Sequence, residues 1–423
     1  MSKLKVCVEV SEEWEGKKVV KDLVEKIKKK IFNPKFILLF STIHYEKEFK
    51  SILSEMKKEF PTIPLVGGTV AGFITPENCY VRGVTVFVLE YPDMDVAVGI
   101  GYNTKRNPKK AASECVKMIK NGLKNSKYPN KFLFCLISGA EILDLPGVGR
   151  KSVIRSGPLA KTIMSSFKTS QYVLQKGFGR EEEVLEEIIK QLPEYSLLHG
   201  STMDDANLIK NFQFFNNNFI KNSVIVLGIS TNLSFNIGFG HGMKKYTNNF
   251  NITKTSDNGQ IIHEINNKPA TEELLRLLNQ DESFFEDKLF KKNFPYFPFG
   301  ITYKKLLLPR GFTMILGKSI LLEAPIKGKS ACFLTTSGSK LVNAVDECFR
   351  GISKKNTQFG LLISCAVRLM TLGDKVYFVR DRLLDHFGKN PFLLIDTVGE
   401  AFYKKNYGLL YLTESIATAC FGI

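Results

Sequence analysis

The sequence predicts a fold between α/β and α+β, in which mixed β-sheets carry helices on their outer side. The first observation is a set of three short apolar runs that end in Ser or Cys, as buried central strands do; they cover 35–41, 131–138 and 359–365. The second is an amphipathic pattern after each run, with apolar residues at three- and four-residue spacing; these stretches cover 45–60, 180–192 and 379–387.

A second apolar run with a polar tip follows each predicted helix. The three versions are IPLVGGTVAG (63–72), YSLLHGSTMDD (195–205) and PFLLIDTVGE (391–400). The residues after each tip have the pattern of further strands and predict a hairpin. We therefore expect repeated strand–helix–strand–hairpin units, and a parallel strand pair joined to antiparallel hairpins gives mixed sheets.

Two segments interrupt this repeat. Residues 139–180 form an insertion in the second unit, and its Gly, Pro and Ser content predicts a flap over a binding site. Residues 250–350 have a different pattern, with a turn at Asn258-Gly259 between two strands, then a helix and further antiparallel strands.

Length, charge and cysteine usage exclude several classes of protein. With 423 residues, the chain is long for one core, and we expect two domains, at 1–245 and 246–423. Much of the formal charge of +17 is Lys beside acidic residues, so we do not expect nucleic-acid binding. No apolar run approaches the ~20 residues that span a bilayer. The eight Cys have no CxxC or CxxH spacing. We expect a cytoplasmic protein with reduced thiols and no metal site, not bound to a membrane.

The polar tips are the first candidate ligand site. The loops at 67–69 and 200–202 (Gly-Gly-Thr and Gly-Ser-Thr) follow strands, so their N–H groups can bind an anion, or the glycines can simply form tight turns. Asp204 and Asp205 can hold an ammonium group, or cap a helix or turn. His241 lies between glycines at a strand end, where it is either a functional imidazole or a structural hydrogen-bonding group.

A second set of candidates lies in the C-terminal half. Cys365 and Arg368 follow the third central strand, where the Arg can stabilise a thiolate or bind a carboxylate bidentately. Arg310 and Glu400 are weaker candidates, because either can form an internal ion pair.

The ordered motifs resemble the FIST family (F-box and intracellular signal transduction), with its N-terminal and C-terminal domains together. The resemblance covers roughly residues 30–405 and is carried by IPLVGGTVAG, LLHGSTMDD, GFGHGMKK, DNGQIIHEINNKPA, FPFGI, LPRG, APIKGK, SCAVR and FLLIDTVGE, in that order. It implies a sensory module that binds a small ligand and passes the signal to an output protein, and some family members are linked to haem and nitric oxide. The sequence departs from the family at His199 and at Asp396-Thr397, where glycine is usual.

We expect a non-enzymatic sensory module that binds an amino acid or related carboxylate between its two domains, with a separate signalling protein as output and no required cofactor. Arg368 would pair with the carboxylate and Asp204 or Asp205 with the amine. The donors would be Gly68, Thr69, Gly200, Ser201 and Thr202.

Two other functions stay open. A haem-based gas sensor would use His241 as axial ligand. An enzyme would use Cys365 as nucleophile, with His241 or His199 within hydrogen-bond reach. In either case, ligands favour the crevice beyond the carboxyl ends of parallel strands. At least two of the tips at Thr69, Thr202 and Cys365 are therefore expected to share a cleft, with His241 at its rim and the insertion over or beside it.

Overall fold

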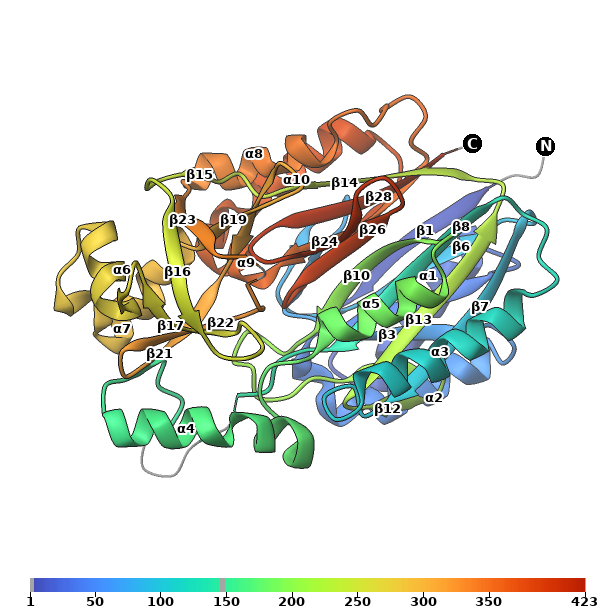
Figure 1. The fold of residues 1–423 in the computed structure, drawn as a ribbon. Helices are drawn as coiled ribbons and strands as arrows, with labels where there is room; N and C mark the ends of the chain where they lie inside the picture. The colour runs from blue at the N-terminus through green and yellow to red at the C-terminus, as the bar shows by residue number, and fades with distance from the viewer. Residues whose placement is uncertain (1–3, 143, 145–148, 327, 423) are drawn as a thin grey trace.

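The structure is a computed structural model that describes residues 4–142, 144, 149–326 and 328–422. Within these residues, three six-stranded sheets and a larger, mainly antiparallel sheet are flanked by helices (Figure 1). The predicted class of mixed sheets with outer helices is confirmed. Residues 143 and 145–148 of the predicted flap lie outside the described residues.

Three consecutive units repeat one order of elements. The first contains β1 (Lys5–Ser11), α1 (Gly16–Lys30), β2 (Phe36–Ser41), α2 (Phe49–Glu59), β3 (Leu65–Thr69), β4 (Gly72–Ile74), β5 (Cys79–Tyr80) and β6 (Val84–Glu90). The second contains β7 (Met94–Tyr102), α3 (Pro108–Leu123), β8 (Asn130–Ser138), β9 (Val153–Ile154), α4 (Gly157–Thr169), α5 (Glu181–Gln191), β10 (Ser196–Thr202), β11 (Gln213–Phe215), β12 (Asn218–Ile220) and β13 (Ser223–Thr231). The third contains β14 (Ser234–Gly240), α8 (Gly338–Cys348), β24 (Phe359–Cys365), α9 (Ala366–Leu372), α10 (Val376–Phe387), β25 (Phe392–Thr397), β26 (Glu400–Lys404), β27 (Gly408–Leu412) and β28 (Ile416–Gly422).

The central pair of each unit is parallel, as the sequence predicts. Strand β2 pairs with β3, β8 with β10, and β24 with β25. The predicted helices are α2, α5 and α10.

The hairpin after each central pair adds to the sheet of a different unit. Strands β11 and β12 of the second unit extend the first sheet next to β3. Strands β26 and β27 of the third unit extend the second sheet next to β10, and β4 and β5 of the first unit extend the third sheet next to β25. This exchange is cyclic, so each sheet of the trio contains strands of two units.

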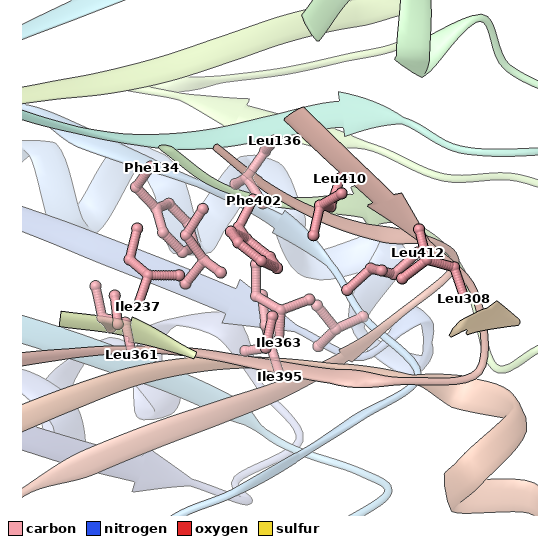
Figure 2. Close-up of a cluster of buried hydrophobic side chains, with 14 of the residues drawn as sticks. Phe134, Leu136, Ile237, Leu308, Leu361, Ile363, Ile395, Phe402, Leu410 and Leu412 are labelled. Carbon is pink, nitrogen blue, oxygen red and sulfur yellow. The ribbon is translucent and has the colours of Figure 1, made fainter. Parts of the chain in front are cut away.

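The three sheets share one apolar core, and helices cover their outer faces. Figure 2 shows part of that core, where Phe134 and Phe402 of the second sheet meet Ile363 and Ile395 of the third. Apolar side chains of α1 and α2 pack on the first sheet, those of α3 and α5 on the second, and those of α8 and α10 on the third. Burial of about 25 cal/mol per Å² of apolar surface makes this shared core the main source of stability.

The remaining sheet is inserted between β14 and α8, and we call it the inserted sheet (left in Figure 1). Its elements are β15 (Lys244–Lys245), β16 (Phe250–Thr255), β17 (Ile261–Ile265), β18 (Lys268–Pro269), α6 (Ala270–Leu278), α7 (Asp287–Asn293), β19 (Phe299–Tyr303), β20 (Leu306–Arg310), β21 (Phe312–Leu316), β22 (Ser319–Leu322) and β23 (Ser330–Thr335). The predicted turn joins β16 to β17, with Gly259 at φ 72°. Strand β9 of the flap pairs with β21, which ties the flap to the inserted sheet. The division of the chain at residue 245 stays a prediction.

Candidate ligand site

The polar tips of the three central pairs contact one another. Thr69, Thr202 and Thr397 end β3, β10 and β25, and all three are completely buried. The N–H of Met203 donates to the Thr69 carbonyl at 3.0 Å, and the N–H of Val398 donates to the Ser201 carbonyl at 3.2 Å. The repeated units therefore bring their strand ends to one region of the molecule.

Neighbouring backbone occupies the N–H groups of these tips. The N–H of Thr69 donates to Phe212 O at 2.9 Å, and that of Ser201 donates to Gly399 O at 3.2 Å. A side chain at Gly68 would lie 2.7 Å from Phe212 O, and one at Gly200 would lie 3.0 Å from side-chain carbons of the third unit. Close approach of another strand accounts for both glycines.

The two aspartates of the second tip have different surroundings. Asp204 is buried and accepts hydrogen bonds from the N–H groups of Leu208 and Ile209, at 2.8 and 2.7 Å, so it organises its own loop. Asp205 is exposed and lines a cavity of about 500 Å³. Residues beside the first and third tips, Ala71 and Ala366, line the same cavity, whereas His241 and the flap do not.

His241 lies against the inserted sheet with both ring nitrogens engaged. Its Nε2 donates to the carbonyl of Leu307 at 3.0 Å, and its Nδ1 accepts from the N–H of Met243 at 3.0 Å. Burial lowers the pKa of the imidazole. A structural role explains this histidine, because the arrangement leaves neither nitrogen free for an iron atom.

The other four candidates come together where the third unit meets the inserted sheet: Arg310 ends β20 of that sheet, and the other three belong to the third unit. Burial is nearly complete for Arg310, Cys365, Arg368 and Glu400, each of which is at most 5% exposed. Two acidic residues that the sequence did not single out, Glu323 and Glu414, act electrostatically on the same groups. We call these six residues the charged cluster.

Local structure places each carboxylate of the charged cluster. Glu400 begins β26, and its Oε1 accepts hydrogen bonds from the N–H and Oγ of Ser415, at 2.7 and 2.6 Å. Glu414 lies in the turn between β27 and β28 at φ 54°, a conformation that L-residues other than Asn and Asp rarely adopt. Glu323 follows β22, and a side chain at Gly311 would lie 2.5 Å from its Oε2. The chain thus accepts backbone strain at Glu414, and Gly311 leaves room for the present position of the Glu323 carboxyl group.

Several polar atoms of the charged cluster have no hydrogen-bond partner in the described protein. The donors among them are Nε of Arg310 and Nη1 of Arg368, and the acceptors are Oε2 of Glu400 and both carboxylate oxygens of Glu414. An orphaned buried polar group costs about 1–3 kcal/mol, more when it is charged, so such atoms are rare in native proteins unless they bind something.

Burial also determines the ionisation of the cluster. It raises the pKa of Glu400 to about 8, against the hydrogen bonds from Ser415, and that of Glu323 to about 7. Burial lowers the pKa of both arginines. Burial, with Glu400 nearby, raises the pKa of the Cys365 thiol well above its ordinary value, which is the opposite of nucleophile activation.

A cleft connects the charged cluster to solvent. It has a volume of about 410 Å³ and is lined by the end of the flap (Gln171), the start of α5 (Glu181), a loop of the inserted sheet (Glu323) and Tyr411 of β27. A smaller cavity of about 160 Å³ shares Tyr411 and reaches Arg310. Burial raises the pKa of Glu181 to about 7. Glu323 therefore lines the cleft, Arg310 lines the smaller cavity, and Tyr411 lines both.

The sequence contains a weak signal for the two missed acids. Glu323 follows the apolar run SILL, and Glu414 follows LLYLT, and acidic residues are seldom fully buried unless they are paired. Nothing in the local pattern shows that these two runs meet, because the strands belong to different sheets.

Comparisons with known proteins identify the family of this three-unit fold. A family model, the FIST N domain, matches residues 35–268, which is more than half of the chain. The chain belongs to the FIST family, and this membership indicates a signal-transduction sensor.

Two further proteins are similar over long stretches. An uncharacterized protein of Methanocaldococcus jannaschii is 20% identical over 259 residues, which make up 61% of this chain and 44% of that relative. This chain therefore matches less than half the length of that curated relative. The crystal structure of cyanuric acid hydrolase from A. caulinodans covers 99% of both chains, with a TM-score of 0.38 and 8% identity, too low to support a statement about activity.

Among the described residues, no helix is both long and apolar enough to cross a membrane. In the same part of the chain, no three His, Cys, Asp or Glu side chains are grouped so that they could hold a metal ion.

Proposed function

We propose that this FIST protein is a non-enzymatic sensor that binds a small zwitterion, an amino acid or a close relative, in the cleft beside the charged cluster. The observation that carries the proposal is the presence of orphaned donors and orphaned carboxylate oxygens within one buried cluster. A molecule with a carboxylate and an ammonium group complements both signs of charge in this cluster, whose orphaned Arg310 Nε and whose Glu323 belong to residues that line the two cavities. A ligand with only one charge would leave the other kind unsatisfied.

The roles of the residues follow from their places in the cleft. Arg310, which lines the smaller cavity and has a free Nε, would bind the carboxylate. Glu323 would bind the ammonium group, because it lines the larger cavity and interacts electrostatically with Arg310. Glu400, Glu414 and Arg368, which line neither cavity, would act on the bound ligand electrostatically from the interior. The six acids at the cleft favour a ligand with an amine over a simple carboxylate; they are Glu181, Glu182, Glu183, Glu186, Asp257 and Glu323.

Binding would be reported to another protein, and the flap is the segment best placed to do so. Its helix α4 packs against β21 of the inserted sheet, and its end lines the cleft. A ligand in the cleft would contact the flap and the inserted sheet at the same time, and so would favour one arrangement of the two.

A thermal-shift and calorimetry screen tests this proposal on the full chain. The panel contains the twenty amino acids and, for each hit, the matching amine without the carboxylate and the matching acid without the amine. A zwitterion at 100 times its dissociation constant is expected to stabilise the protein by about 2.7 kcal/mol, and both half-molecules by much less. The proposal is wrong if no zwitterion at 10 mM (about the weakest useful affinity) shifts the melting temperature.

Two variants locate the site. Glu323→Gln keeps the shape of the side chain and is expected to weaken binding at least tenfold, and Arg310→Gln is expected to do the same. The matched controls are Glu264→Gln and Arg382→Gln, which alter more exposed ion pairs outside the cleft and are expected to leave affinity within twofold. Binding that survives both cleft variants unchanged would show that the ligand lies elsewhere.

A further inference from the structure

A second cavity, of about 500 Å³, lies where all three units meet, and it shares no lining residue with the cleft. The first unit contributes Phe73 and Tyr80, the second contributes Ala206, and the third contributes Leu369 and Tyr377. We call it the tip cavity, because it lies beside the ends of β3 and β24.

One buried acid forms the polar part of the tip cavity. Asp396, next to the end of β25, is 2% exposed, and its Oδ2 has no hydrogen-bond partner in the described protein. Gly72 lies beside this oxygen, and a Cβ there would be 2.8 Å from the Tyr80 carbonyl, 3.0 Å from Leu369 and 3.4 Å from Oδ2, so residue 72 has no side chain that covers the carboxylate. An orphaned carboxylate oxygen facing a cavity is a binding group that lacks its ligand.

The walls of the tip cavity are apolar and aromatic. Phe73 and Tyr80 stack at a centroid distance of 5.0 Å, and Leu369 of α9 packs beside them. At its mouth, Met370 is 65% exposed and Tyr377 is 46% exposed, which is high for such side chains. A cavity with largely apolar walls and a buried carboxylate at its base is the usual form of a small-molecule site.

The charged groups around Asp396 indicate the sign of the charge that a ligand of the tip cavity must carry. Besides Asp396, two acids and His44 line the tip cavity, the acids being Asp205 and Asp374. Ser364 and Arg368 lower the pKa of Asp396, but burial outweighs them and raises it to about 7; the Cys79 thiol is also close by. A carboxylate ligand would be repelled here, whereas an ammonium group would stabilise the ionised acid.

We propose that the tip cavity is a second ligand site, which binds a primary amine attached to an apolar alkyl or aryl body. The ammonium group donates to Asp396 Oδ2, and the apolar body packs between Tyr80 and Leu369, where aromatic faces also attract a cation. The site is independent of the zwitterion site, and its ligand class differs because it has no orphaned donor for a carboxylate.

Calorimetry on the full chain at pH 8 tests this, with 2-phenylethylamine as the probe. The neutral match is 2-phenylethanol and the anionic match is 3-phenylpropionate. The amine is expected to bind at least tenfold more tightly than the alcohol, and the acid not at all. At pH 6, where Asp396 is mostly protonated, the affinity for the amine is expected to fall about tenfold, since a group with a pKa near 7 must then first lose its proton.

Variants separate this site from the cleft. Asp396→Asn is expected to reduce amine affinity at least tenfold without loss of stability, since the lost oxygen has no partner. Leu369→Trp, which fills the cavity, is expected to abolish binding while Asp396 remains. The control Asp385→Asn, which changes an exposed acid of α10 outside the cavity, is expected to leave binding unchanged.

The proposal is overturned if the amine does not bind, if the alcohol binds equally well, or if Asp396→Asn binds like the native protein. Loss of amine binding in Glu323→Gln but not in Asp396→Asn would assign the amine to the cleft instead.

Discussion

Two buried polar regions of this molecule occupy neighbouring units and have opposite character. In the second unit, Asn211 Oδ1 accepts hydrogen bonds from Ser138 at 2.8 Å, from Thr202 at 3.0 Å and from Gln213 at 3.0 Å. Gln213 in turn accepts from the Ser223 hydroxyl at 2.7 Å. The charged cluster, which the third unit and the inserted sheet form together, keeps several donors and acceptors without partners in the described residues. The side chains of both regions are buried, but those of the second unit bond to one another while those of the charged cluster keep orphaned atoms.

The difference separates a structural role from a binding role. A fully bonded polar network fixes how strands meet, and it loses stability when any member is removed. A buried cluster with orphaned groups lowers the stability of the unliganded protein, and evolution retains such groups where a ligand completes them. The second-unit network should therefore respond to mutation through stability, and the charged cluster through pH and ligand.

The largest effect on stability is expected from Asn211→Ala. The change leaves three buried groups without their acceptor, and we expect a loss of about 3 kcal/mol or more in the free energy of unfolding. Urea denaturation measures it. The control Asn207→Ala removes an exposed side chain that donates a hydrogen bond to Asp205, and it should cost less than about 0.5 kcal/mol. Equal effects of the two changes would remove the contrast between the regions.

A pH dependence of stability is expected from the charged cluster. Folded Glu400 keeps its proton up to a pKa of about 8, whereas the unfolded side chain releases it near 4.3. The unfolded state thus binds fewer protons between these values, and stability falls as pH rises from 6.5 to 8. In Glu400→Gln this fall should be flatter by about 1 kcal/mol per pH unit. Urea denaturation at both pH values measures the slope, and Glu264→Gln should keep the native slope.

A smaller effect is expected from the strained turn. Glu414→Gly removes an orphaned carboxylate and places glycine at φ 54°, where an L-residue is disfavoured by about 1 kcal/mol. We expect the variant to be more stable by about that amount and to bind the zwitterion less well. Glu414→Gln replaces the carboxyl group with an amide but keeps the backbone strain, so the difference between the two variants isolates the strain. A less stable glycine variant would show that the carboxylate supports the fold.

Much of the fold was predictable from the sequence, because its central strands and helices have local signals. The apolar runs that became β2, β8 and β24 end at a serine or cysteine, and α2, α5 and α10 have clear amphipathic spacing. The cyclic exchange of hairpins was not predictable, since β4, β11 and β26 carry no mark of the sheet that receives them. Register between distant segments depends on tertiary packing rather than on local pattern.

The candidate site was predictable only where a residue lies next to a strand end. Cys365 and Arg368 were found from the end of β24, and Glu400 from the motif at the start of β26. Glu323 and Glu414 were missed because they reach the cluster from other parts of the chain. The sequence leaves two interpretations of Gly68 and Gly200 open, an anion-binding nest or a tight turn. In the structure, neighbouring backbone and side chains of other units approach both glycines, and that contact depends on the same unpredictable exchange.

Two buried cysteines, one in the second unit and one in the third, extend the comparison to thiol reactivity. Cys135 lies in β8 of the second unit and Cys365 ends β24 of the third; both are at most 2% exposed, and burial raises the pKa of both well above the ordinary value. Cys365 has carboxylates and an arginine beside it, whereas Cys135 lies among apolar side chains.

If burial and the acids raise the pKa of the Cys365 thiol more than Arg368 lowers it, both thiols stay protonated. They should then react equally slowly with iodoacetamide in the native protein, within about threefold, because reaction requires local opening. Cys79, which is partly exposed, should be labelled first. Mass spectrometry of timed samples measures each site, and full labelling of all eight thiols in urea is the control. A Cys365 that reacts many times faster than Cys135 would mean that Arg368 holds a thiolate, and the charged cluster would then be a catalytic centre rather than a binding site.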